Sequence, residues 1–148
     1  MYLPYPFEIT QSTNKVHLAF AFSNSARTIH LDKVEGPPSD LWMGHSVGRW
    51  EGDTLVVDVK EFNDKTWFDI VGDFHSDQVH IRERFTIVSA DRIDYQATFE
   101  DPKVYTRPWT VQIPLSRDDE YQIYEYACHE GNHAIEHMLR GGRARDRE

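Results

Sequence analysis

The sequence predicts an all-β protein: a single antiparallel β-barrel, or a strongly bent sheet, with a short C-terminal helix. Short runs rich in Val, Ile, Thr, Tyr and Phe recur along most of the 148 residues. Turn residues separate these runs at the spacing of a β-meander. Because many strands in one small domain would leave exposed edges, closure into a barrel is the expected architecture. The length suits one domain over residues 1–148.

The strand-forming runs lie, in chain order, at 7–12, 15–22, 26–31, 46–51, 54–60, 78–88, 92–100, 108–115 and 121–128. Three connections between them are tight. Thr13 and Asn14 form a turn, residues 51–53 form a glycine-containing hairpin, and Ala90 with Asp91 forms a third. Such short connections predict that neighbouring strands pair antiparallel.

Two connections are too long to be simple turns, and a helix follows the strands. Residues 32–45 contain a Gly-Pro-Pro sequence, and residues 61–77 are rich in aromatic side chains without a clear period. Long loops in compact domains are commonly lids or binding loops, so we expect residues 61–77 to cover a site. Asn132 suits a helix cap and Gly141 suits the position after a helix, which predicts a helix over 132–140 that closes one end of the barrel.

Charge and apolar content exclude several classes of protein. The net charge of −9 repels phosphate backbones and anionic lipids, so we expect neither nucleic acid nor membrane as a partner. The apolar fraction of 39% is too high for disorder, and no apolar run is long enough to span a membrane. We therefore expect a soluble protein. Cys128 is the only cysteine, so it forms no intrachain disulfide, and we interpret it as a packing residue.

Three charged residues interrupt the apolar faces of the predicted strands. They are Arg27, Glu83 and Glu125. A carboxylate alone in an apolar interior must be paired, hydrogen-bonded or protonated. Jointly, the three could form an acid–base site with shifted pKa values. Alternatively, a β-bulge turns both glutamates to water, or Arg27 forms a structural pair with one of them.

Aromatic side chains and a histidine complete the predicted site in the barrel mouth or interior. His75 is a candidate general base, oriented by Asp77 or Asp69, because histidine titrates near neutrality. Trp67, on the long loop, is the tryptophan most expected to touch an apolar ligand. The candidate catalytic residues are Glu83, Glu125, His75 and Arg27, and the candidate substrate-binding residues are Trp67, Phe68, Tyr95 and Asp69.

The histidines raise the question of a metal. Residues 129–133 read HEGNH, which matches the HExxH zinc motif, but Gly131 and Asn132 are poor residues for the middle of the required helix. We therefore expect no metal and no cofactor. An alternative site would join His75, His80 and His129 around a divalent transition metal. His133 and His137, four residues apart, could bind metal adventitiously at the surface.

Several tracts resemble a family of uncharacterised bacterial proteins, many of them predicted to be exported. The tracts are SVGRWEGDTLVVDV (46–59), FNDKTW (62–67), HSD (75–77), ERF (83–85), DPKVYTRPW (101–109) and EYACHEGN (125–132). The resemblance implies an exported or periplasmic location, and the upstream extension usual in the family implies that Met1 begins a trimmed or short version. The predicted meander is itself similar to the calycins, the lipocalin-like barrels.

Two classes of function remain open. The leading hypothesis is an enzyme that applies general acid–base chemistry to a small apolar or aromatic-containing substrate, as an isomerase, lyase, cyclase or hydrolase. The alternative is a non-catalytic carrier of a small ligand. A second alternative is a histidine-rich, metal-dependent enzyme. The expected partner is in each case a small molecule, and a homodimer is left open.

Overall fold

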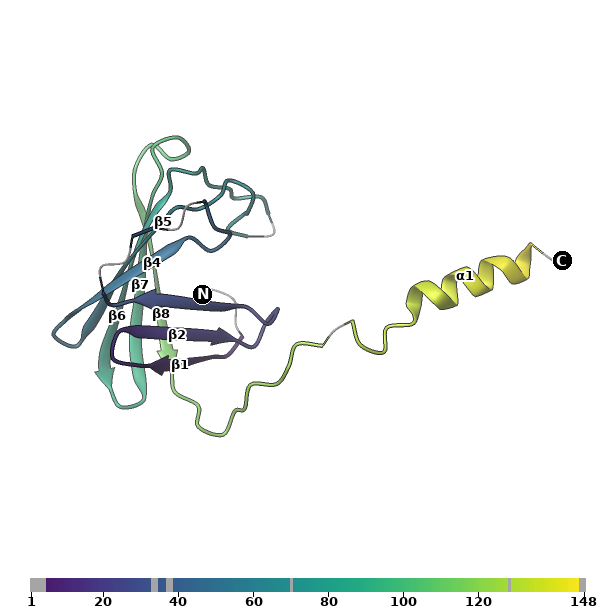
Figure 1. The fold of residues 1–148 in the computed structure, drawn as a ribbon, viewed down its shortest axis with the longest axis horizontal. Coiled ribbons are helices and arrows are strands. Elements are labelled where there is room, and N and C mark those ends of the chain that lie inside the picture. The colour runs from purple at the N-terminus through teal and green to yellow at the C-terminus, as the bar shows by residue number, and fades with distance from the viewer. Residues whose placement is uncertain (1–4, 33–34, 37–38, 70, 128, 147–148) are drawn as a thin grey trace.

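The computed structural model describes residues 5–32, 35–36, 39–69, 71–127 and 129–146. Eight strands form one sheet in chain order, from β1 at one edge to β8 at the other, and one short helix follows. Figure 1 shows that the sheet curls into a half-barrel. The predicted all-β, barrel-like fold is confirmed.

The first eight predicted strands are present, with boundaries shifted by a few residues at most. The ninth, 121–128, is wrong: the described residues 117–127 form no strand, and Cys128 lies outside the described residues. The strands are β1 (Phe7–Gln11), β2 (Lys15–Phe20), β3 (Ala26–His30), β4 (His45–Glu51), β5 (Thr54–Lys60), β6 (His80–Ser89), β7 (Arg92–Glu100) and β8 (Trp109–Ser116).

One strand pair departs from the predicted antiparallel pattern. β3 and β4 pair parallel, through Ile29 with Ser46 and His30 with Val47. The physical reason is the long connection over residues 31–44, since a parallel pair needs a crossover of a dozen or more residues. All other neighbouring strands pair antiparallel. β1 and β8 are the edges of the sheet, so the barrel is not closed.

The core lies on the concave face of the sheet, where strand alternation places the apolar residues. Gly48 lies on this face because a Cβ there would be only 2.7 Å from Cγ2 of Ile29. Its lack of a side chain therefore allows Ile29 to pack closely against β4. The buried core side chains are Val16, Leu18, Ile29, Leu55, Val57, Val59, Phe62, Val79, Ile81, Phe85, Tyr95 and Ala97.

The two long loops are joined to each other at one end of the half-barrel. The backbone N–H of Leu41 donates to the carbonyl of Glu61, and the N–H of Asn63 donates to the carbonyl of Leu41, both at 2.9 Å. Asp101, which follows β7, holds the second loop: its carboxylate accepts the Ser76 N–H at 2.6 Å and the Ser76 hydroxyl at 2.8 Å. The loops thus form the mouth of the half-barrel.

The helix α1 spans Ala134–Arg145, which corrects the predicted range of 132–140. Asn132 precedes the helix and accepts the Ala134 N–H at 3.1 Å, while His133 holds the cap position. Gly141 does not end the helix, because its φ is not positive. No residue of α1 is buried, and Figure 1 shows the chain after β8 leading away from the sheet to α1. The helix therefore does not close the barrel.

Candidate functional site

The charged residue predicted on the inner face of β6 is buried there and is fully paired. Glu83 is 3% exposed. Its Oε1 accepts hydrogen bonds from Nη1 of Arg27 at 3.1 Å and from the Tyr95 hydroxyl at 2.7 Å. Its Oε2 accepts from Nη2 of Arg27. Three of the predicted site residues, from β3, β6 and β7, are therefore in contact.

The electrostatics of this group stabilise the ion pair. Burial acts to lower the pKa of Arg27, but the facing carboxylate of Glu83 outweighs it, so the pKa lies above its ordinary value. Burial first, and the Glu83 carboxylate second, raise the pKa of Tyr95, so its hydroxyl stays protonated and donates. The pair joins β3 to β6 across the concave face, since β4 and β5 lie between them in the sheet.

Glu125 does not join this group. It lies in the segment after β8, outside the sheet, and is exposed. Its predicted inward position is wrong. Residues Tyr121–Ala127 alternate between apolar and polar side chains, but they do not pair with any described strand. The segment contacts the sheet further along: the Asn24 side chain donates to the Tyr126 carbonyl at 3.1 Å and accepts the Tyr126 N–H at 2.8 Å.

His75 is buried, at 3% exposure, and both ring nitrogens have partners. Nε2 and the Thr66 hydroxyl are 2.6 Å apart, and Nδ1 lies 3.0 Å from the Ser76 carbonyl. Because a carbonyl only accepts, Nδ1 donates, and in the neutral ring Nε2 accepts the Thr66 hydroxyl proton. The predicted orientation by Asp77 or Asp69 is wrong.

The two aspartates have other structural roles. Oδ1 of Asp69 accepts the backbone N–H groups of Val71, Gly72 and Asp73 at 2.9–3.1 Å, which fixes the tip of the long loop. Asp77 pairs with Lys103 at 2.6 Å. Asp69 is therefore placed to support the loop.

The predicted aromatic residues separate into core and surface. Phe68 packs edge-on against Phe99 and Trp109, with ring centroids 5.0 and 6.1 Å away, and joins the core. It also lies beside the His75 ring, at 4.9 Å. Trp67 is 67% exposed. The loop predicted as a lid is thus anchored into the core through Phe68 and His75.

The alternative triad of His75, His80 and His129 is not assembled. His80 bonds through Nε2 to Asp58 at 2.7 Å, and His129 is exposed in the C-terminal segment. Within the described residues, no three His, Cys, Asp or Glu side chains are grouped so as to hold a metal. His129 precedes α1, which begins at Ala134, so the HEGNH residues do not form the helix that the zinc motif requires.

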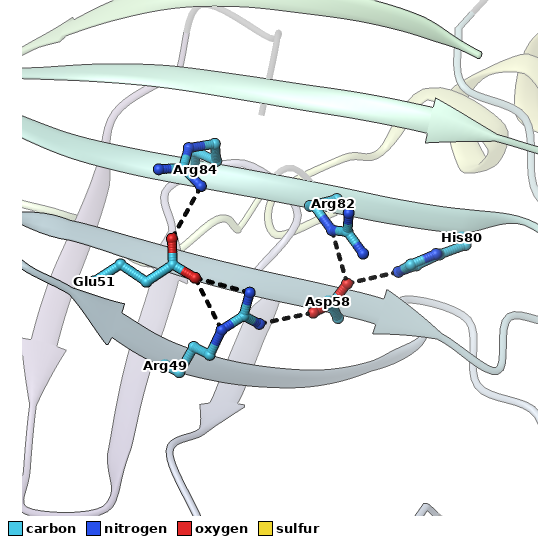
Figure 2. A network of polar contacts seen from close by, with 6 residues as sticks. All are labelled: Arg49, Glu51, Asp58, His80, Arg82 and Arg84. Atoms are coloured by element: carbon cyan, nitrogen blue, oxygen red, sulfur yellow. Dashed lines mark hydrogen bonds and ion pairs between the residues drawn. The ribbon is translucent and has the colours of Figure 1, made fainter.

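The outer face of the sheet carries a polar network that the sequence analysis missed (Figure 2). Arg49 bridges Glu51 and Asp58, at 2.9 and 3.1 Å. Asp58 also accepts from His80 and Arg82, and Glu51 from Arg84. Burial acts to raise the pKa of Asp58, but these hydrogen bonds outweigh it and the pKa is lowered. The charged residues at 49 and 51, and at 82 and 84, alternate with inward-facing positions, and this pattern could have indicated a charged outer face.

Two adjoining hollows lie at the mouth and share Asp77. The first, of about 420 Å³, is lined by Asp40, Trp42, Asn63, Asp64, Lys65 and Asp77. The second, of about 390 Å³, is lined by Lys60, Glu61, Asp77, Gln78, Val79, His80, Glu100 and Pro102. The first is formed by the two long loops, where a binding site was predicted, and the second lies mainly at the ends of β5, β6 and β7. None of the predicted catalytic or substrate-binding residues lines either hollow.

No family model matches this chain, and comparison with curated proteins and with solved structures finds no match either. The predicted family resemblance therefore stays a prediction. Among the described helical residues, none form a helix long and apolar enough to cross a membrane.

Proposed function

We propose that this protein binds a small, polar, hydroxyl-rich molecule in the 420 Å³ hollow at the mouth, as a carrier and not as an acid–base enzyme. One observation carries the proposal: the hollow combines an aromatic surface with several hydrogen-bonding groups. Trp42 is 63% exposed. The volume falls in the range of small-molecule sites, roughly 300–1,000 Å³.

The lining suits a sugar-like ligand. The indole of Trp42 offers a flat apolar surface for the C–H face of a sugar ring. The carboxylates of Asp40 and Asp64 accept hydrogen bonds from ring hydroxyls, and the ammonium of Lys65 donates them. Oδ1 of Asn63 already accepts the Lys65 N–H, which leaves its amide nitrogen to donate. This polar lining favours a more polar ligand than the apolar substrate expected from the sequence.

Two observations favour binding over acid–base chemistry at the predicted residues. Both oxygens of Glu83 already accept hydrogen bonds, two from Arg27 and one from Tyr95. Both nitrogens of His75 are likewise engaged by its own loop. A general base must be within reach of the substrate proton, and Glu83 and His75, each only 3% exposed, are both engaged in contacts that hold the fold.

Amide NMR spectra of the protein, recorded during titration with a panel of monosaccharides and disaccharides, test the proposal. We expect saturable shifts for residues 40–42 and 63–65 with at least one member of the panel. Trp42→Ala should weaken that binding at least tenfold, and Asp64→Asn should weaken it to a smaller extent, because each removes one contact from an open site. No turnover of the bound sugar is expected.

Trp50→Ala is the matched control, since Trp50 is also exposed but does not line the hollow. It should bind as the unaltered protein does. Binding that survives Trp42→Ala unchanged, or a full panel that shifts no signal at the mouth, would refute the proposal. Turnover abolished by Glu83→Gln in a folded variant would instead support the enzyme hypothesis.

A further inference from the structure

Four basic side chains lie together at one end of the outer face, on β2 to β5. Lys15 and His30 are opposite one another on β2 and β3, and His45 and Lys60 are opposite one another on β4 and β5. The two histidines meet across the parallel seam, with ring centroids 5.3 Å apart and planes inclined by 30°. All four point outward, because their neighbours Val16, Ile29, Ser46 and Val59 are buried.

This basic row differs from the Figure 2 network on the same face. There, each arginine and His80 has a carboxylate partner in Glu51 or Asp58. In the described part of the chain, no carboxylate forms an ion pair with Lys15, His30, His45 or Lys60. In a protein of net charge −9, four adjacent basic groups without acidic partners are unusual.

One of the two rings also has an unpartnered buried nitrogen. Nε2 of His45 is buried and has no hydrogen-bond partner among the described residues. The charges that act on His30 are all positive, from His45 and Lys15. Both rings sit on strands, so their positions are fixed before any ligand arrives.

We propose that His30 and His45, flanked by Lys15 and Lys60, form a binding site for a doubly charged tetrahedral oxyanion, such as inorganic sulfate or the phosphate group of a small molecule. Two imidazolium rings about 5 Å apart can each donate to a different oxygen of one oxyanion, at roughly 2.7–2.9 Å. The ammonium groups on either side add charge without needing a fixed geometry. Because the rings lie on opposite sides of the short parallel seam, the anion would also link β3 to β4.

The site is expected to depend on pH. Burial, then His45 and Lys15, lower the pKa of His30 in the free protein, so its imidazolium forms at a lower pH than in an ordinary histidine. A bound dianion favours the charged ring and raises that pKa, so binding strengthens as pH falls. The other titratable groups on or just beyond these strands are His17 on β2, Asp58 on β5, Asp32 after β3 and Glu61 after β5. Asp58 is already engaged by Arg49, His80 and Arg82.

Sulfate is the appropriate probe, because its charge is constant over the pH range in which histidine titrates. NMR signals of the histidine rings would be followed during sulfate titration at pH 6.0 and pH 8.0, with ionic strength held constant by chloride. The lower pH remains above the pI of about 5.3, which preserves solubility. We expect saturable shifts confined to His30 and His45, with affinity at least tenfold higher at pH 6.0.

Variants that each remove one basic side chain distinguish binding at this site from non-specific attraction of sulfate to positive charge. His30→Asn and Lys15→Gln should each weaken sulfate binding at pH 6.0 at least fivefold. Arg92→Gln removes the same single charge from an exposed arginine paired with Asp94, so it should bind sulfate as the unaltered protein does. In addition, sulfate should raise the thermal midpoint at pH 6.0, and His30→Asn should remove most of that increase.

Several outcomes would overturn the proposal. Shifts that stay linear in sulfate concentration, or that decrease equally in Arg92→Gln, would show an adventitious ion only. Saturable binding of Zn²⁺ by the two rings, with no response to sulfate, would replace the oxyanion site with a bis-imidazole metal site. If His30→Asn fails to fold, Lys15→Gln and the pH dependence of the unaltered protein still decide the question.

Discussion

Replacement of Arg27 by Met should be one of the most destabilising single changes in this protein. The Arg27 and Glu83 side chains are 11% and 4% exposed. Without the guanidinium, the buried Glu83 carboxylate keeps only the Tyr95 hydroxyl as partner. Breaking a buried pair from one side costs about 3–5 kcal/mol. Because one hydrogen bond survives, we expect a loss of about 3 kcal/mol.

A second substitution, Glu83→Gln, removes the carboxylate charge that Arg27→Met leaves unpaired. Arg27→Met combined with Glu83→Gln leaves a neutral amide that still accepts from Tyr95, so the double variant should recover about 1–2 kcal/mol relative to Arg27→Met alone. Urea unfolding, monitored by tryptophan fluorescence and far-UV circular dichroism, measures each free energy of unfolding. The pairwise coupling energy follows from the cycle that includes Glu83→Gln alone.

A surface pair provides the control. Arg92 and Asp94 form an ion pair with side chains 55% and 51% exposed. Arg92→Met should therefore change the free energy of unfolding by less than about 1 kcal/mol. If Arg27→Met costs no more than Arg92→Met, or if the double variant is less stable than Arg27→Met, the account of the buried pair is wrong.

Three further predictions concern packing, pH and the C-terminal segment. Gly48→Ala places a methyl group 2.7 Å from Ile29 and should cost about 1–3 kcal/mol in urea unfolding. Burial acts to raise the pKa of Asp101, but hydrogen bonds led by the Ser76 N–H outweigh it and lower the pKa from 3.8. The ionised carboxylate therefore stabilises the fold above about pH 4, and this contribution is lost as the pH falls below that value. Thermal melts of Asp101→Asn should lack this pH-dependent part of the stability. Deletion of 130–148 should leave the urea midpoint unchanged, because no residue of α1 is buried.

The strands, and as one of the open alternatives the pair of Arg27 with a glutamate, could be predicted from the sequence because both depend on local alternation. A period of two along a strand reports which side chains share a face, so Glu83 among Ile81 and Phe85 indicated an inward carboxylate. Arg27 lies two residues before Ile29 on β3, so the two side chains share the inner face. Of the alternatives left open, the structural pair between Arg27 and one glutamate is the one that the structure contains.

The failures have a common cause, which is that alternation does not show what covers a face. Residues 121–127 alternate as well as β7 does, yet no described strand pairs with them, so Glu125 remains exposed. Similarly, Val56 on the outer face is fully buried, although it is outside the core cluster. Its strand neighbours in the register are Arg49 and Arg84, whose aliphatic stems can cover an apolar side chain.

The residues that line the first hollow, and those of the outer basic row, were missed because they lie far apart in sequence. The first hollow needs Asp40 and Trp42 beside residues 63–65, a juxtaposition created by the hydrogen bonds between Leu41 and its partners Glu61 and Asn63. The basic row needs the parallel seam, which the sequence analysis did not predict. No short-range pattern reports either arrangement.

The Arg27–Glu83 pair has a structural consequence in a sheet whose two edges do not pair. An open sheet has no pairing between β1 and β8 to maintain its curl, so the Arg27–Glu83 pair, which joins β3 to β6, supplies a link that a closed barrel would not need. That link consumes both oxygens of Glu83. Among the described residues, the buried side-chain atoms without a hydrogen-bond partner include Nε2 of His45 on the outer face and, on the inner face, Nε of Arg27 and Oγ of Ser46. The buried Arg27–Glu83 pair therefore has a structural role in this fold, which is to hold β3 to β6.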